Sequence, residues 1–179
     1  MGRWQISVLT AVVLLAGCGG DSGSSASEDY ANDVCSNLST WVTTVDGAAK
    51  SLGEAGLSID RDDVQKAVSD VSDATDTLVD DLKQLGPPET DAGTQAKSEL
   101  DSLGNTLAQQ VDTVEGALNG GGSAIALATT VTTALSTAAD AVESTYQSLQ
   151  GLDLGGELQN GFENAEDCKS LSDQLEAIG

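Results

Sequence analysis

The sequence contains no histidine and few aromatic or basic side chains. Of its 179 residues, seven are Lys or Arg, and Phe, Trp and Tyr together make up 3%. Histidine is the commonest general base and metal ligand, so its absence argues against acid–base and metal chemistry. The scarcity of aromatic rings argues against a sugar or nucleobase site built by stacking. The scarcity of cations argues against nucleic acid as a partner.

The first twenty residues have the order of a secretory signal. They read MGRWQISVLTAVVLLAGCGG, in which Arg3 is followed by an apolar run over residues 6–15 and then by small residues before Cys18. The run is too short for a membrane span, which takes about 20 residues. We therefore expect residues 1–17 to be a signal peptide that is removed. The alternative is an ordinary signal peptide that ends near a cysteine by chance.

The residues around the cleavage point predict how the chain is attached. Leu15-Ala16-Gly17-Cys18 resembles the lipobox of bacterial lipoproteins, which implies lipidation of the Cys18 thiol. The stretch GGDSGSSASE follows without helical period, so residues 18–28 are expected to form a flexible tether with a reach of roughly 17 Å. The sequence thus predicts an extracytoplasmic protein that the lipid on Cys18 anchors to the cell membrane.

Residues 18–179 are numerous enough for one domain with a core. They carry 29 acidic and six basic side chains (all basic residues except Arg3), a formal charge of −23. The apolar residues are too regularly spaced for a disordered chain. Two interpretations of the acidic surface stay open: solvation, including adaptation to high salt, and recognition of a partner, which would be a cation, a basic protein or an uncharged surface.

The two cysteines that remain after lipidation lie near opposite ends of this region. Cys35 and Cys168 permit one intramolecular disulfide, in a compartment where disulfides persist. Such a bond closes a long loop and stabilises the fold by up to roughly 5 kcal/mol. Two free thiols or a metal pair are the alternatives, and two sulfurs without histidine make a poor metal site. We predict the disulfide.

Five segments show the helical repeat of apolar residues, and no strand-like alternation occurs. The apolar residues that share one helix face in a segment are called its seam. The first seam contains Tyr30, Val34, Leu38, Trp41, Val45, Ala48 and Leu52. The second contains Val64, Val68, Val71, Thr75, Leu78, Leu82 and Leu85. The next two contain Ala96, Leu100, Leu103, Leu107, Val111, Val114 and Leu118, and then Ala128, Val131, Leu135, Ala138, Val142 and Leu149. Residues 29–179 are therefore expected to form an all-α, up-and-down bundle of four long helices, to which the disulfide ties a C-terminal helical segment.

The helix boundaries carry further expectations. Asp60 is expected to cap the second helix, and Gly86-Pro87-Pro88 to end it. The fourth segment has no charged residue over residues 123–139. The threonines in this uncharged run and its short length argue against a membrane span. We expect this helix to lie in the middle of the bundle. A straight fifth helix would leave Cys35 and Cys168 roughly 12 Å out of register, so we expect a break near Gly161.

Several short motifs in this region resemble a known group of proteins. They are Asp29-Tyr30-Ala31, Val34-Cys35, Leu38 and Trp41, then Leu85-Gly86-Pro87-Pro88, and Gly156-Glu157-Leu158 with Phe162, Cys168 and Leu171. Together with the lipobox, they resemble small helical lipoproteins of actinobacteria. The resemblance implies export, a lipid on Cys18 and paired cysteines at positions 35 and 168. It implies no activity and no catalytic residue.

Candidate catalytic and metal sites are weak. The adjacent acids Asp62-Asp63, Asp80-Asp81 and Glu166-Asp167 point in different directions on a helix. Asp60-Arg61-Asp62-Asp63 lacks the glycine and the distal glutamate of a calcium loop, and Asp62, Asp73, Asp76 and Asp80 are explained by capping and solvation. Trp41 is expected to be a core residue. We expect no catalytic residue, no cofactor and no metal.

The functional prediction is a non-catalytic, membrane-anchored helical module that binds an unknown protein or envelope component. The alternative is a carrier of a small apolar or cationic ligand within the bundle, which would need a pocket above about 300 Å³. A hydrolase based on two carboxylates would need two acids that converge in a cleft.

Overall fold

The computed structural model describes residues 25–152 and 156–178. Within them the chain forms helices and no strand, in the order α1 (Ala26–Ala55), the 3-10 turn η1 (Gly56–Ser58), α2 (Arg61–Gln84), α3 (Asp91–Gly120), α4 (Ala124–Gly151), α5 (Glu157–Asn164) and α6 (Glu166–Ile178). The predicted all-α class is therefore confirmed. The predicted signal peptide (residues 1–17), Cys18 and the first part of the tether lie outside the described residues.

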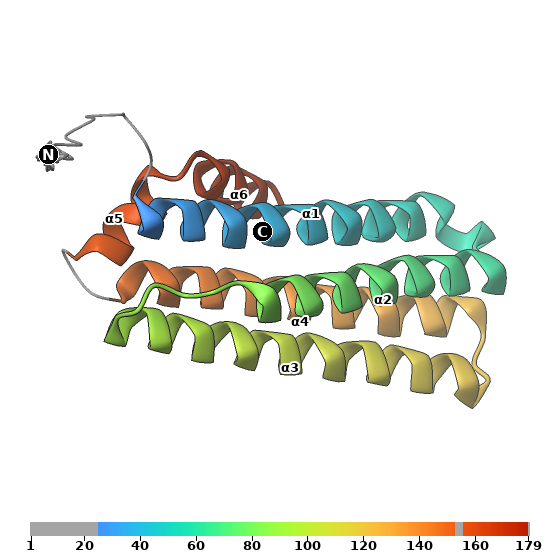
Figure 1. Ribbon diagram of the computed structural model, residues 1–179. Coiled ribbons are helices and arrows are strands. Elements are labelled where there is room, and N and C mark those ends of the chain that lie inside the picture. Colours follow the sequence, from blue (N-terminus) through green and yellow to red (C-terminus); the bar gives the residue numbers. More distant parts are fainter. Residues whose placement is uncertain (1–24, 153–155, 179) are drawn as a thin grey trace, which may run out of the picture.

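Helices α1 to α4 lie side by side and run alternately in opposite directions (Figure 1). Each packs most closely on its neighbours in the chain, and α5 and α6 pack mainly on α1. In Figure 1 both short helices lie at the end of the bundle where α1 begins. The architecture is the expected one, four long helices with a C-terminal segment fastened to the first.

One continuous core fills the bundle, and its buried residues among those described lie between Ser27 and Leu175. The predicted apolar seams supply most of it, and Trp41 is 2% exposed, as expected for a core residue. A chain that begins at residue 18 thus keeps every residue of this core. The largest fully buried side chains include Trp41, Phe162, Leu38, Leu78, Leu107, Leu149, Leu158 and Leu171.

Side chains close the helix ends in the expected way for α2. Asp60 Oδ1 accepts a hydrogen bond from Asp63 N at 2.9 Å, and Asp63 Oδ2 accepts one from Asp60 N at 3.2 Å. This capping box satisfies two backbone donors of the first turn. At the same end of the bundle, Arg61 donates to the carbonyl oxygens of Leu118 (3.1 Å) and Gly122 (2.8 Å), where α3 ends. A guanidinium at this helix terminus also faces the negative end of the α3 dipole.

The first helix begins earlier than predicted. The tether was expected to run to Glu28, but α1 begins at Ala26, and Ser25 caps it by accepting from Glu28 N at 3.2 Å. Acids in the first turn, Glu28 and Asp29, are favoured by the helix dipole. Ser27 is buried, since its backbone lies against Gly161. The stretch that looked structureless therefore contains the cap and the first turn of α1.

The prediction that the uncharged fourth helix lies in the middle of the bundle is wrong. Helix α4 buries one face, with Val131, Leu135 and Val142, and exposes the opposite one, where Thr129 and Thr133 lie. These threonine hydroxyls donate to carbonyl oxygens four residues earlier, at 2.9 Å in both cases. The face needs no charge because its polar groups are satisfied within the helix. Among the described helices α4, with 28 residues, is the one long and apolar enough to cross a membrane, by length and composition only.

The expected break in the C-terminal segment exists, but not at Gly161. Gly161 lies inside α5, and the helix ends at Asn164, where Ala165 turns the backbone into an extended conformation (φ −55°, ψ 127°). A Cβ at Gly161 would lie 2.5 Å from the carbonyl oxygen of Ser27. This glycine therefore serves close packing of α5 on α1, while Ala165 makes the bend.

Candidate functional site

The predicted disulfide joins α1 to α6. The sulfurs of Cys35 and Cys168 are bonded, their Cα atoms are 4.9 Å apart, and both side chains are fully buried. The bend at Ala165 places Cys168 in the first turn of α6, opposite the third turn of α1. The bend thus removes the register mismatch that a straight fifth helix would have produced. Free thiols and a metal pair are excluded for these two cysteines in this structure.

Helix α6 follows α1 in the same direction. Asn32 Oδ1 accepts a hydrogen bond from Asp167 N at 3.3 Å, and Ser39 Oγ donates to Gln174 Oε1 at 2.9 Å. The two residues of each hydrogen-bonded pair are separated by the same number of positions in the sequence, so α1 and α6 run parallel. The C-terminal end of α6 is therefore directed toward the second half of α1.

Aromatic residues pack α5 and α6 against the beginning of α1. The rings of Tyr30 and Phe162 meet edge to face with centroids 6.5 Å apart. The Tyr146 hydroxyl donates to the carbonyl oxygen of Cys168 at 3.1 Å and accepts from Gln150 Nε2 at 2.8 Å. Burial, with a smaller contribution from the charge of Asp101, raises the pKa of Tyr30 to about 12, and burial also raises the pKa of Tyr146. Both phenols are therefore neutral at physiological pH.

A groove of about 680 Å³ opens between α1 and α4 where α6 ends. We call it the α1/α4 groove. Aliphatic side chains form its floor, and polar and charged ones form its walls. Its floor consists of Val42, Val45, Ala49, Leu135, Ala139 and Leu175, and its walls of Thr43, Asp46, Lys50, Thr132, Ser136, Asp140, Glu143 and Gln174.

The α1/α4 groove continues the surface on which α6 lies. Along α1, Asn32, Cys35 and Ser39 contact α6 through the interactions above, and Val42, Asp46 and Ala49 follow at the same alternating steps of three and four. Positions with this spacing share one helix face. The same face of α1 is therefore occupied by α6 over its first turns and borders the groove over the next ones, where Val42 is buried and Asp46 and Ala49 are half-buried.

The positive charges of the described residues are all engaged within the chain. Lys50, Lys66, Lys83 and Lys97 form ion pairs with Asp46, Asp70, Asp80 and Asp101 on their own helices, Arg61 binds the end of α3, and Lys169 Nζ donates to the carbonyl oxygen of Asn164. These surface pairs add little stability. Their effect is that the exposed surface presents unneutralised carboxylates. In the α1/α4 groove, Asp140 and Glu143 form no ion pair with any basic side chain of residues 25–152 and 156–178.

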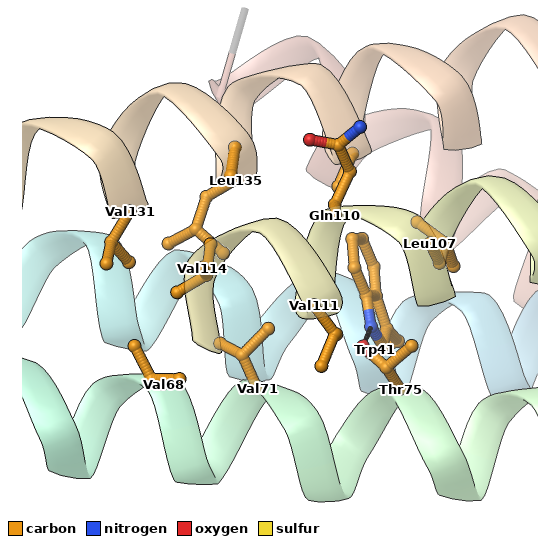
Figure 2. A pocket seen from close by; sticks show the side chains of 12 residues that line it. Trp41, Val68, Val71, Thr75, Leu107, Gln110, Val111, Val114, Val131 and Leu135 are labelled. Carbon is orange, nitrogen blue, oxygen red and sulfur yellow. Dashed lines mark hydrogen bonds between the residues drawn. The ribbon is translucent and has the colours of Figure 1, made fainter. Parts of the chain in front are cut away.

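The cavity beside Trp41 in the bundle interior is too small for a drug-sized ligand. A cavity of about 20 Å³ lies among the four long helices beside Trp41 and Val114, enough for about one water-sized group (Figure 2). Trp41 Nε1 donates to Thr75 Oγ1 at 3.0 Å, which satisfies the indole in this apolar surrounding. The space falls far below what the ligand-carrier alternative needs.

The other residues that the sequence singled out stay apart. Asp62, Asp73, Asp76 and Asp80 are exposed along α2, and the described residues contain no cluster of three or more acids or cysteines that could hold a metal. Sequence reasoning missed the α1/α4 groove, although Val42 and Ala49 showed an apolar face wider than one seam requires.

No family model, curated protein or solved structure matches this chain.

Proposed function

We propose that this protein is a lipid-anchored, extracytoplasmic lipoprotein whose helical bundle binds a protein or envelope component and catalyses no reaction. In this proposal, Cys18 carries the lipid after residues 1–17 are removed, and the residues before Ser25 form the tether. The lipobox-like ending Leu15-Ala16-Gly17-Cys18 and the resemblance to actinobacterial lipoproteins support the anchor.

The single observation that carries the binding function is the position of the open groove relative to the tethered end. Helix α1 begins at Ala26, immediately after the tether, and α5 and α6 cover that end. The α1/α4 groove begins at Val42, about 24 Å further along α1. The tether is attached at the covered end of the bundle, and in this proposal a partner binds the groove, which lies away from that attachment point.

The anchor is tested by Cys18→Ala in the native host. We expect the protein to move from the membrane fraction to the soluble fraction, or to accumulate with its signal attached. Membrane retention of a cleaved Cys18→Ala protein would contradict the lipid anchor.

Chemical crosslinking of the unaltered protein in intact cells, followed by its purification, tests the binding function by whether any envelope component is captured reproducibly.

A further inference from the structure

The disulfide is enclosed by the two helices that it joins. Cys35 and Cys168 each have 0% of their surface exposed, and Cys168 Sγ lies 3.3 Å from the carbonyl oxygen of Ala31. The residues one turn before and one turn after each cysteine are also 0% exposed; they are Ala31 and Leu38 on α1, and Ala165 and Leu171 on α6. Within the described part of the chain, neither helix face therefore leaves a path from solvent to a sulfur.

Hydrogen bonds fix α6 on α1 on both sides of the cysteine. Asp167 N donates to Asn32 Oδ1 at 3.3 Å, and Ser39 Oγ donates to Gln174 Oε1 at 2.9 Å. Cys168 lies between Asp167 and Gln174 in the chain, so α6 is held at both ends of the stretch that covers the bond. A molecule that attacks a sulfur must first displace this helix.

Reduction of a disulfide requires direct contact with one of its sulfurs. In thiol–disulfide exchange a thiolate attacks one sulfur, the S–S bond breaks, and the other sulfur leaves as a thiolate. When the reductant is a dithiol, its second thiol then displaces the cysteine from the mixed disulfide. Two electrons and two protons pass from the dithiol to Cys35 and Cys168, and the dithiol closes into a cyclic disulfide. The first attack is blocked while both sulfurs are enclosed.

Helices α5 and α6 can detach without unfolding of the bundle. They pack mainly on α1, whereas α1 to α4 pack most closely on their neighbours in the chain. Proteins open locally in such cooperative units, with free energies below that of global unfolding. The large apolar side chains that detachment would expose on α5 and α6 are Leu158, Phe162, Leu171 and Leu175.

We propose that the docking of α5 and α6 on α1 controls the redox state of this protein. The Cys35–Cys168 bond is shielded from thiol reductants while both helices are docked, and it is reduced only when they detach, with α1 to α4 still folded. A partner that holds α5 and α6 in place would protect the bond, and one that lifts them would promote its reduction. This inference concerns the domain alone and does not depend on the binding function proposed above.

The first test measures thiol release from residues 18–179 with Cys18→Ala, which retain the described core and lack the third thiol of the sequence. The protein is incubated with dithiothreitol at mildly alkaline pH, samples are alkylated at intervals, and mass spectrometry counts the free thiols. We expect the folded protein to be reduced at least about a hundredfold more slowly than the same protein unfolded in guanidinium chloride. Equal rates would show that the bond is accessible in the folded state and would overturn the proposal.

The dependence of this rate on urea separates local from global opening without any change in the core. Below the unfolding transition, the logarithm of the rate rises with urea in proportion to the surface that the opening exposes. We expect a slope below about half of that for global unfolding, because α5 and α6 are a small part of the domain. A slope equal to the global one would show that the whole bundle must unfold, and the proposal would fail.

Two buried leucines provide a matched pair of variants. Leu171 on α6 is 0% exposed and Leu107 on α3 is 1% exposed. Leu171→Ala weakens the packing of α6 and should speed reduction of the folded protein at least about tenfold. Leu107→Ala weakens the bundle core instead, and in the absence of urea it should change the rate by less than about twofold. Acceleration of the same size in both variants would assign the opening to the whole bundle and contradict the proposal.

Two serines provide a milder pair that leaves the core intact. Ser39 Oγ joins α1 to α6 through Gln174, and Ser72 Oγ joins α2 to α3 by donating to Glu115 Oε1 at 3.2 Å. Ser39→Ala removes one hydrogen bond from the docked segment and should speed reduction by about three- to tenfold. Ser72→Ala should leave the rate unchanged. An unchanged rate in Ser39→Ala, or an equal effect in Ser72→Ala, would count against control by α6 docking.

Discussion

The two halves of α1 have the same helical repeat but different surroundings. The covered half, residues 26–39, has α5 and α6 on its outer side, joined by the disulfide and by the ring contact between Tyr30 and Phe162. The open half, residues 40–55, is bordered by the α1/α4 groove and by a second groove of about 750 Å³ against α2. The inner face of both halves is buried, so the bundle core does not distinguish them.

The difference shows that one helix serves two purposes. The covered half contacts α5 and α6 through Tyr30, Cys35 and Ser39, whereas the outer surface of the open half carries Gly47, Thr43 and Ser51. Nothing lies within 4 Å of a Cβ placed on Gly47, so packing within the chain does not require this glycine. A glycine in a helix interior costs roughly 0.5–1 kcal/mol relative to alanine. The outer face of the covered half therefore packs against α5 and α6, whereas the outer face of the open half borders two grooves.

Removal of the Phe162 side chain should change the stability of the covered half more than any other change considered. Phe162 is 1% exposed and packs on Tyr30, so Phe162→Ala should lower the free energy of unfolding by about 3–5 kcal/mol. Hydrogen exchange should show the loss of protection in residues 26–39 and 157–178 before residues 40–55. Equal loss along the whole of α1 would show that the two halves are not separable.

Loss of the disulfide is expected to have the second largest effect on stability. Cys35→Ala/Cys168→Ala should lower the free energy of unfolding by about 2–4 kcal/mol, since the bond closes a loop with a sequence separation of 133. Denaturant unfolding measures the change, and hydrogen exchange with and without reductant locates it. Helices α5 and α6 should lose protection first, and α1 to α4 should remain folded. Uniform loss in all helices would mean that the C-terminal segment belongs to the bundle core.

Alanine at two glycines should act in opposite directions. Gly161→Ala places a Cβ against the backbone of Ser27, and we expect a loss of about 1–3 kcal/mol through separation of α5 from α1. Gly47→Ala meets open space and should raise stability by roughly 0.5–1 kcal/mol. Thermal unfolding of both variants measures the effects. A stabilising Gly161→Ala would show that close contact at α5 is not needed.

Alkaline pH should loosen the covered half selectively. The pKa of Tyr30 is raised to about 12 in the folded protein against 10.0 for the ordinary phenol, so its contribution is complete below pH 10 and is lost as the pH rises toward 12. We expect a loss of up to about 2 kcal/mol, measured by urea unfolding across this range. Tyr146 acts in the same direction. In Tyr30→Phe the dependence should flatten; an unchanged slope would assign it to other groups.

Neutralising the outer acids of α2 should have the smallest effect. Asp73, Asp76 and Asp80 are exposed on α2, so their triple change to Asn should leave stability unchanged or raise it by up to about 0.5 kcal/mol. Chemical denaturation measures the change. Tight calcium binding that this triple variant abolishes, measured by calorimetry, would instead show that these acids form a site.

The sequence predicted what depends on local repeats and missed what depends on packing between distant segments. The four seams, the Asp60 cap and the single cysteine pairing follow from spacing and arithmetic, and the structure confirms them. The bend at Ala165 was expected four residues earlier, because Gly161 looked like a breaker and its contact with Ser27 is invisible in sequence. The α1/α4 groove is lined by residues of α1, α4 and α6, and their meeting depends on packing between distant segments, which no local pattern encodes.

The pairing of the last helix with the first also determines an order of events during synthesis. Tyr30 and Cys35 leave the ribosome early, but Phe162, which packs on Tyr30, and Cys168, which forms the disulfide with Cys35 when an oxidant removes two electrons, follow only after nearly the whole bundle. At about 10 residues per second, this delay is on the order of ten seconds. During that interval the first helix presents an uncovered apolar face and an unpaired thiol. Until α6 arrives, that face is open to chaperones, and the thiol can exchange with a small-molecule disulfide, which leaves a mixed disulfide on Cys35 and releases one thiol.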